Sequence, residues 1–138
     1  MSEELTIESI NKNISILLHL KNIPILGICF GFQIMAASYG GKIDSMNKEE
    51  SGVFDVNLIK RSIIMKNLDN KFKVFQSHKD IVKQIPPNFE IIGIDNNNNI
   101  QIIENIENKC WGVQFHPEGL ENTNIIIKNF INIVYQKD

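Results

Sequence analysis

Apolar residues recur at helical spacing in three segments of the chain. These segments are residues 6–20, 30–39 and 124–135. Each is long enough for two or more turns of a helix with one buried face. Gly40 and Gly41 follow the second segment, as glycine commonly does at the end of a helix. The predicted core face of the third segment consists of Ile127, Phe130, Ile131 and Val134.

Shorter apolar runs between these segments predict strands. Residues 23–28 form a short apolar run that carries β-branched residues, which is typical of a buried parallel strand. Residues 53–58 alternate in character, which predicts a half-buried strand. The other predicted strands are residues 63–65, 72–75, 90–95, 100–104 and 110–115. We interpret the asparagines at 96–99 as a hairpin turn and the segment around Glu49 as a solvated loop. The pattern predicts an α/β fold in a single domain, residues 1–138.

Composition and charge argue against a nucleic-acid-binding protein and against a membrane-spanning one. The chain has 138 residues, 43% of them hydrophobic, and a net charge of −2, so nucleic acid is not an expected partner. No apolar run approaches the roughly 20 residues that span a bilayer. The acidic start at Ser2–Glu4 does not resemble a targeting signal, so a cytoplasmic protein is expected. Cys29 and Cys110 are then expected to be reduced thiols, with Cys110 in the core.

The pentapeptide Gly27-Ile28-Cys29-Phe30-Gly31 has the form of a nucleophile elbow. In such an elbow the nucleophile sits on a tight turn between a buried strand and a helix, and flanking glycines allow close backbone approach. The free N–H groups at the helix start are expected to favour the Cys29 thiolate, and the Phe30 N–H becomes a candidate oxyanion donor. The pentapeptide is equally compatible with a small buried residue at a strand end.

His116 and Glu118 lie at the end of another predicted strand. A thiol nucleophile needs a base, and the base needs a group that orients its ring. Two residues apart in a loop, Glu118 can reach the His116 imidazole. A structural histidine near a turn is the alternative interpretation.

Two motifs together resemble the class I glutamine amidotransferases. Residues 24–33 resemble the cysteine motif of that family, and residues 112–118 resemble its histidine–glutamate motif. The resemblance implies a flavodoxin-like open sheet and a Cys29–His116–Glu118 triad that hydrolyses glutamine through a thioester. It also implies glutamine-binding roles for Gln33, Ser77 and His78. Segments 50–54 and 77–80 are most similar to the glutaminase domain of the GMP synthases.

The chain departs from the family at two places. Lys79 stands where the family usually has glycine, which is expected to weaken glutamine binding. The family's usual N-terminal βα units, with a second oxyanion donor, are not recognisable before residue 6, so the fold is expected to be N-terminally truncated. We therefore expect the chain alone to be a poor glutaminase, and another chain to complete its sheet or accept the ammonia.

Three functions remain open from the sequence. The first is a glutaminase that feeds ammonia to a synthetase subunit. The second is a stand-alone γ-glutamyl hydrolase or peptidase with the same triad. The third is an inactive relative that binds or regulates another protein. No cofactor is expected, and a metal site is not expected because the cysteines and histidines lack the short spacing typical of zinc ligands.

Overall fold

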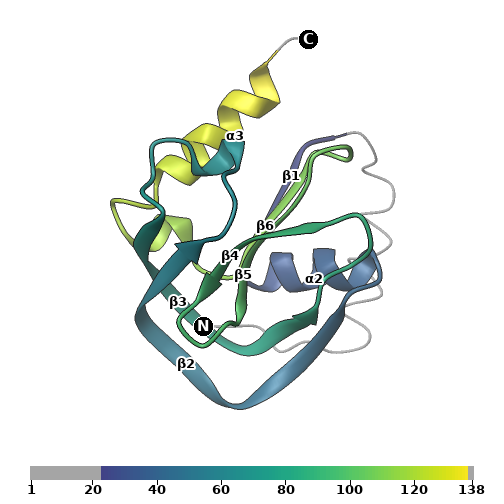
Figure 1. The fold of residues 1–138 in the computed structure, drawn as a ribbon, viewed down its shortest axis with the longest axis vertical. Helices are drawn as coiled ribbons and strands as arrows, with labels where there is room; N and C mark the ends of the chain where they lie inside the picture. The colour runs from purple at the N-terminus through teal and green to yellow at the C-terminus, as the bar shows by residue number, and fades with distance from the viewer. Residues whose placement is uncertain (1–22, 137–138) are drawn as a thin grey trace.

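Six strands form one sheet in the structure, a computed structural model that describes residues 23–136. The helix predicted at residues 6–20 lies outside these residues. Along the chain the strands are β1 (Ile25–Ile28), β2 (Lys42–Leu58), β3 (Lys71–Gln84), β4 (Glu90–Asp95), β5 (Ile100–Asn105) and β6 (Cys110–Val113). Their order across the sheet is β1-β6-β5-β4-β2-β3 (Figure 1). The helical elements are α2 (Phe30–Ser38), α3 (Ile125–Tyr135) and the 3-10 turns η1 (Ile63–Met65) and η2 (Pro117–Gly119).

The sheet is mixed. β1 pairs with β6 in parallel, with Ile25 opposite Cys110 and Ile28 opposite Val113. The other pairings among the described strands are antiparallel. The predicted α/β class is confirmed. The parallel β1–β6 pair matters most for the site, because it brings the ends of two strands far apart in sequence to the same edge.

The two faces of the sheet are covered by different helices. On β6, Cys110 belongs to a core cluster with residues of α2, whereas Trp111 and Val113 belong to a cluster packed against α3 and η1. This alternation is the two-residue period of a strand buried on both faces. Asn129 of α3 donates to the carbonyls of Ile64 and Lys66, both at 2.9 Å, and so fastens α3 to η1.

β2 and β3 form a long antiparallel ribbon that curls around the rest of the sheet. Its register is irregular between Ser45 and Glu50, and Figure 1 shows β2 bending sharply at the bottom of the view. Bulges of this kind bend and twist a strand. As a result β3 returns to the segment after β6, where Phe75 forms an isolated antiparallel bridge with His116. The curl therefore places β3 beside the strand ends of β1 and β6.

Three sequence predictions about the elements are wrong. Residues 63–65 form the 3-10 turn η1 rather than a strand. The segment around Glu49 is part of β2, which starts at Lys42 rather than near residue 53. The buried positions of α3 are Ile126 and Asn129, while Ile131 and Val134 are each 45% exposed. Apolar residues occur on all sides of α3, so the sequence pattern did not identify the side that packs against the rest of the protein.

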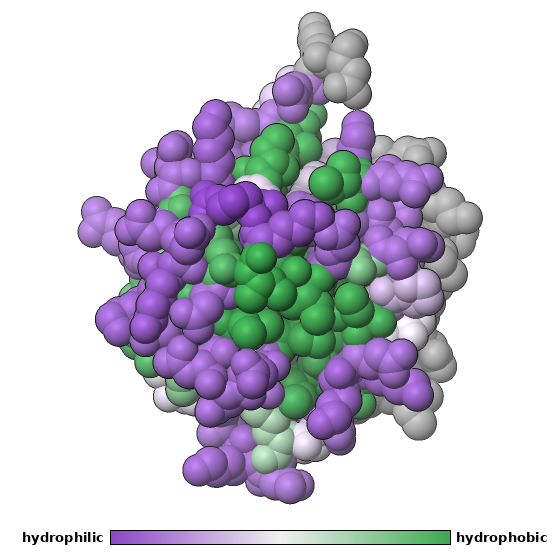
Figure 2. All heavy atoms as spheres, in the orientation of Figure 1, coloured by the Kyte–Doolittle hydropathy of each residue, from purple (hydrophilic) through white to green (hydrophobic). Residues whose placement is uncertain are grey.

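Part of the apolar surface of the described domain is uncovered. Figure 2 shows apolar side chains gathered in the middle of one face, with polar side chains around them. The large exposed hydrophobic residues are Ile23, Val53, Ile59, Ile63, Ile106, Ile131, Val134 and Tyr135. None of the helices within residues 23–136 is long and apolar enough to cross a membrane.

Candidate active site

Cys29 occupies the turn between β1 and α2. Its backbone has φ 53° and ψ −106°, a conformation that residues with a side chain seldom adopt. Such backbone strain costs on the order of 1–3 kcal/mol and is concentrated at functional sites. The turn is held on both sides: the Cys29 N–H donates to the Val113 carbonyl at 2.8 Å, and the Gln33 N–H donates to the Cys29 carbonyl at 3.1 Å. The predicted strand-to-helix elbow is confirmed.

The two glycines of the elbow have different environments. A Cβ on Gly27 would lie 2.9 Å from both the Gly31 carbonyl oxygen and the Phe32 nitrogen, so β1 and α2 pack too closely for any side chain there. A Cβ on Gly31 would meet no described atom within 4 Å. The close-approach argument therefore applies to Gly27 and not to Gly31.

The Cys29 sulfur is buried and held by two polar groups. The thiol donates to the Ser77 carbonyl at 3.6 Å, and the Gln114 side-chain amide donates to the sulfur at 3.8 Å. Burial raises the pKa of the Cys29 thiol above its ordinary value of 9.0, while the Phe30 N–H lowers it by a smaller amount and the Glu118 charge raises it further. The N–H at the helix start therefore acts in the expected direction, toward the thiolate, but the loss of solvation has the larger effect on the pKa.

His116 and Glu118 are directly paired. The His116 Nδ1 lies 2.8 Å from the Glu118 Oε1, and the His116 N–H donates to the Phe75 carbonyl at 2.8 Å. Pro117 and Glu118 belong to the short turn η2, which directly follows His116. The Thr123 hydroxyl donates to the Pro117 carbonyl at 2.7 Å and so fastens this turn to the segment before α3. Because the carboxylate only accepts, it selects the tautomer with the proton on Nδ1 and leaves Nε2 as the basic nitrogen.

The elbow and the histidine–glutamate pair lie at one edge of the sheet. Cys29 follows β1 and His116 follows its parallel neighbour β6, and β3 contacts both, through Ser77 at the sulfur and Phe75 at the histidine backbone. His116 is not among the hydrogen-bond partners of the Cys29 sulfur that the described residues provide. The three side chains share one region, and the thiol–imidazole hydrogen bond of a working triad stays a prediction.

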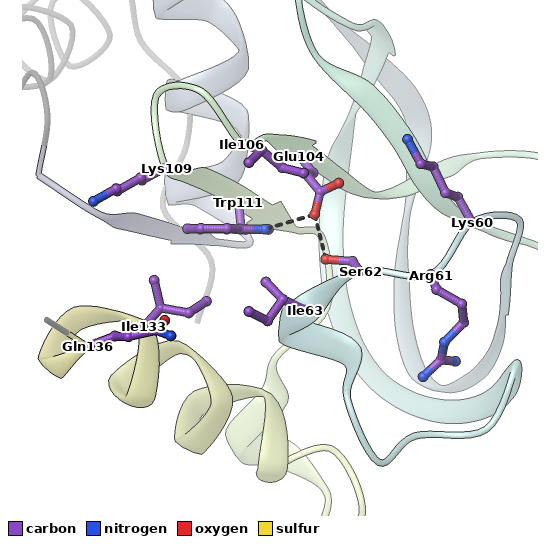
Figure 3. Close-up of a pocket in the computed structure, with 10 residues that line it drawn as sticks. All are labelled: Lys60, Arg61, Ser62, Ile63, Glu104, Ile106, Lys109, Trp111, Ile133 and Gln136. Carbon is purple, nitrogen blue, oxygen red and sulfur yellow. Dashed lines mark hydrogen bonds between the residues drawn. The ribbon is translucent and has the colours of Figure 1, made fainter. Parts of the chain in front are cut away.

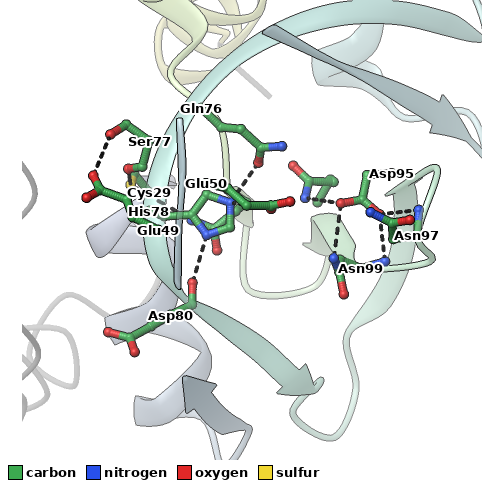
Figure 4. Close-up of polar contacts among 12 residues, drawn as sticks. Cys29, Glu49, Glu50, Gln76, Ser77, His78, Asp80, Asp95, Asn97 and Asn99 are labelled. Atoms are coloured by element: carbon green, nitrogen blue, oxygen red, sulfur yellow. Dashed lines mark hydrogen bonds and ion pairs between the residues drawn. The ribbon is translucent and has the colours of Figure 1, made fainter. Parts of the chain in front are cut away.

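The residues predicted to bind glutamine are already engaged within the protein. The Gln33 amide donates to the Asp80 carbonyl at 2.7 Å and to the Gln114 Oε1 at 3.2 Å, and is 3% exposed. The Ser77 hydroxyl donates to the Glu49 carboxylate at 3.2 Å. His78 points into the protein, with its ring between the Gln76 side chain and the Asp80 carbonyl (Figure 4). Their roles toward glutamine therefore stay predictions.

His78 is surrounded by polar groups. Its Nδ1 lies 3.0 Å from the Asp80 carbonyl, so the proton of the neutral ring sits on Nδ1. The Glu50 carboxylate lies 3.6 Å from its Nε2. Burial lowers the pKa of His78 below 6.5, although the Asp80 carbonyl and the Glu50 charge act in the opposite direction. His78 is therefore a buried residue of β3 with polar partners at both ring nitrogens.

Sequence reasoning missed Gln114, the only side chain found to donate to the Cys29 sulfur within residues 23–136. Gln114 lies within the recognised histidine–glutamate motif, directly after β6 and two positions before His116. Its place in that motif was the available signal. Lys79, which departs from the family pattern, is an exposed residue of β3 without a positive φ, so the strand accommodates its side chain.

A cavity of about 310 Å³ lies away from this edge, against the α3 face of the sheet. Its lining includes Trp111, Ile63 and Ile133, together with Glu104, whose carboxylate accepts from the Trp111 indole at 3.0 Å and the Ser62 hydroxyl at 2.6 Å (Figure 3). It contains none of the elbow or histidine–glutamate residues. In the part of the chain that the structure describes, no three histidine, cysteine or carboxylate side chains are grouped as metal ligands.

Comparison with known proteins places these motifs in a family. Residues 4–133 match the family model for the class I glutamine amidotransferases. The chain is 37% identical over 114 residues to a glutamine-hydrolysing GMP synthase subunit of Pyrococcus abyssi, and 39% identical over 114 residues to the corresponding protein of Methanobrevibacter smithii. It is 41% identical over 112 residues to a glutamine-hydrolysing GMP synthase of Clostridium botulinum.

The chain spans only part of these relatives. The matches cover 81% of this chain but 61% and 60% of the Pyrococcus and Methanobrevibacter proteins, and 79% of this chain but 22% of the Clostridium protein. The alignment is therefore confined to a fraction of each relative.

Solved structures agree with the sequence comparison. A protein described as a GMP synthase subunit from Thermoplasma acidophilum superposes with a TM-score of 0.83 at 25% identity, covering 92% of this chain and 64% of that one. A glutamine amidotransferase from Thermotoga maritima superposes with a TM-score of 0.73 at 25% identity, covering 92% and 54%. The curled mixed sheet, the cysteine elbow and the matched family model agree, and the chain belongs to the class I glutamine amidotransferase family.

Proposed function

We propose that this domain hydrolyses glutamine to glutamate and ammonia with Cys29 as nucleophile, His116 as base and Glu118 as the group that orients His116. The observation that carries the proposal is the meeting of the strained Cys29 elbow and the His116–Glu118 pair at the ends of two adjacent parallel strands. If Cys29 and His116 had only structural roles, this arrangement would serve no purpose. The strained backbone of Cys29 would then also be unexplained.

The first half of the proposed reaction forms a thioester. The Cys29 thiol exchanges the Ser77 carbonyl for the His116 Nε2 and gives its proton to the ring. The sulfur attacks the amide carbon of the glutamine side chain, and the Phe30 N–H donates to the oxygen that becomes negative. His116 then returns the proton to the leaving nitrogen, which departs as ammonia while the γ-glutamyl group stays on the sulfur.

The second half consumes one water molecule. His116 removes a proton from the water, whose oxygen attacks the thioester carbon. The C–S bond breaks, glutamate leaves, and the sulfur recovers a proton from His116. Glu118 keeps the ring in one tautomer throughout and stabilises the imidazolium when it forms, without itself taking the proton.

The binding of glutamine is proposed for the β3 edge beside the sulfur. Ser77 and His78 follow each other on β3 next to Cys29, where their backbone groups can hold the α-amino and α-carboxyl groups of the substrate. Gln33 would have to leave the Asp80 carbonyl to contact substrate directly. The ammonia is proposed to pass to a separate synthetase subunit, because the relatives named above are GMP synthases or GMP synthase subunits.

An inactive binding or regulatory relative is the second candidate. It is favoured by the raised pKa of Cys29 and by the hydrogen bond of its thiol to Ser77 instead of His116. Both observations describe the protein without substrate, in which catalytic hydrogen bonds are often long or misaligned. A stand-alone γ-glutamyl hydrolase would use the same residues but would need no partner for full activity.

The test is glutamate release from glutamine, measured with and without a GMP synthetase subunit. The matched variants are Cys29→Ala and Cys110→Ala, each of which removes one buried thiol. We expect activity that the synthetase increases, that Cys29→Ala abolishes and that Cys110→Ala retains. Equal activity in Cys29→Ala would refute the nucleophile, full activity without a synthetase would favour a stand-alone hydrolase, and no activity in any mixture would favour the inactive relative.

A further inference from the structure

Two buried glutamine side chains, Gln33 and Gln114, form a row of hydrogen bonds that ends at the Cys29 sulfur. Gln114 is completely buried, and its backbone N–H donates to the Gln101 carbonyl at 2.8 Å, which fixes the residue at the end of β6. Its side-chain Nε2 donates to the sulfur at 3.8 Å, and its Oε1 accepts from the Gln33 Nε2 at 3.2 Å. A buried amide whose two ends are both engaged has a defined position.

The orientation of the Gln114 amide follows from the neighbouring groups. The Asp80 carbonyl can only accept, so the Gln33 group 2.7 Å from it must be the amino end of that side chain. The second hydrogen of the same amino group then points to Gln114, where it requires an oxygen. The amino end of Gln114 is therefore turned toward the sulfur. A flipped Gln114 would set two amino groups against each other.

The sulfur thus has an acceptor on one side and donors on the other. The Ser77 carbonyl suits the neutral thiol, whereas the Gln114 amide and the Phe30 N–H suit the thiolate. Once the thiol proton has gone to a base, the Ser77 interaction is lost and the amide interaction is strengthened, because a hydrogen bond to a charged acceptor is stronger than one to a neutral acceptor.

We propose that Gln114 is a further catalytic residue, whose side-chain amide donates to the Cys29 sulfur and stabilises the attacking thiolate, in an orientation set by Gln33 and the Asp80 carbonyl. This inference rests on the proposed role of Cys29 as the nucleophile. Gln33 acts in this scheme through Gln114, independently of any contact with substrate.

The test is the pH dependence of Cys29 alkylation by iodoacetamide, followed on the peptide that contains Cys29 so that Cys110 does not interfere. Gln114→Met keeps the length of the side chain and removes the donor. We expect its alkylation midpoint to move to higher pH by about half to one unit, equivalent to roughly 3- to 10-fold less thiolate at a given pH below the midpoint. Gln33→Met should move the midpoint in the same direction by less, because Gln114 remains but loses its orienting partner.

Gln101→Met is the matched control. Gln101 is also completely buried in the same sheet, but its side chain contacts Asp95 and not the sulfur, so its loss should leave the midpoint unchanged. A purely structural role for Gln114 would lower stability and leave the midpoint where it is in the parent, which would overturn the proposal. If Gln114→Met does not fold, Gln114→Asn decides, since it keeps an amide but withdraws it from the sulfur and should raise the midpoint.

The titration is separate from the proposed function. It reads the ionisation of Cys29 without glutamine, so a chain that releases no glutamate would contradict the glutaminase proposal and still allow Gln114 to be judged. Conversely, a chain that hydrolyses glutamine with an unshifted Gln114→Met midpoint would keep the proposed function and remove Gln114 from it.

Discussion

The His116 Nδ1 lies 2.8 Å from the Glu118 Oε1, in a pair whose side chains are partly exposed to solvent. Because Glu118 orients the ring and does not react, Glu118→Gln should weaken catalysis without removing a reacting group. In triads of this kind the loss of the orienting residue is about 100-fold less severe than the loss of the base. We therefore expect kcat for glutamate release to fall far more in His116→Ala than in Glu118→Gln. Equal losses would show that Glu118 does more than orient the ring.

Gly27 offers a test of the elbow as a structural unit. In Gly27→Ala the new Cβ would lie 2.9 Å from backbone atoms of Gly31 and Phe32, which cannot move aside as a flexible side chain could. We expect the free energy of unfolding to fall by about 1–3 kcal/mol, as for other overpacked sites, and glutaminase activity to fall because Cys29 is displaced. Urea unfolding measured on the purified variant checks the first expectation.

Gly31→Ala is the control for this prediction. Its Cβ would meet no described atom within 4 Å, and the position lies in the first turn of α2. Alanine in a helix is more favourable than glycine by about 0.5–1 kcal/mol, so stability should stay equal or rise. A Gly27→Ala variant as stable as Gly31→Ala would contradict the close packing of β1 against α2.

Asp95 is expected to be a main determinant of the β4–β5 hairpin. Its nearly buried carboxylate accepts from the backbone N–H groups of Asn97 and Asn99 at 2.8 and 2.9 Å, and from the Asn99 and Gln101 side chains. Hydrogen bonds to a charged acceptor contribute about 1.5–3 kcal/mol each, not additively. Asp95→Ala should therefore destabilise the protein by about 2–4 kcal/mol.

Asp95→Asn is the matched variant, because it keeps the shape and one accepting oxygen. We expect it to lose less stability than Asp95→Ala in the same urea titration. If both variants unfold at the parent's midpoint, the carboxylate does not hold the turn, and the asparagine run at residues 96–99 folds without it.

The sequence predicted the elements whose pattern is set locally. The apolar run before Gly27 and the helical segment after Cys29 could be recognised from neighbouring residues alone, and they correspond to β1 and α2. The first half of β2 was missed because it is polar on both sides and is a strand only through its pairing with β3. The turn at Ile63 was mistaken for a strand because β-branched residues also fit a short turn, which Asn129 of α3 stabilises from far away in the sequence.

The candidate site also divides into residues that the local sequence predicts and properties that depend on the whole fold. Cys29, His116 and Glu118 were predicted because each lies in a motif whose chemistry can be read from residue types. The upward shift of the Cys29 pKa was not, since it depends on how completely the fold removes water from the sulfur. The contact of Gln114 with the sulfur likewise requires the register of β6 against β1, which only the three-dimensional structure provides.

The last prediction concerns alkaline pH. Burial raises the pKa of Tyr39 from 10.0 to about 12, and contact with Cys110, 3.6 Å from the hydroxyl, adds to the shift. Burial also raises the pKa of the Cys110 thiol. Both groups release their protons more readily in the unfolded chain, so their contribution to stability is complete below their unfolded pKa values. It is lost as the pH rises through the folded ones. The free energy of unfolding should therefore decrease between about pH 9 and pH 12.

Tyr39→Phe separates this cause from general alkaline damage. The phenylalanine can keep the ring contact with Phe89, whose centroid lies 5.3 Å from that of Tyr39, and it removes the ionisable hydroxyl. We expect the variant to lose less stability than the parent between about pH 10 and pH 12, in urea titrations at fixed ionic strength. Cys110→Ala should flatten the curve nearer about pH 9, where the ordinary thiol ionises. If Tyr39→Phe follows the parent's curve, the alkaline loss arises elsewhere, and the half-buried tyrosine hydroxyl does not control it.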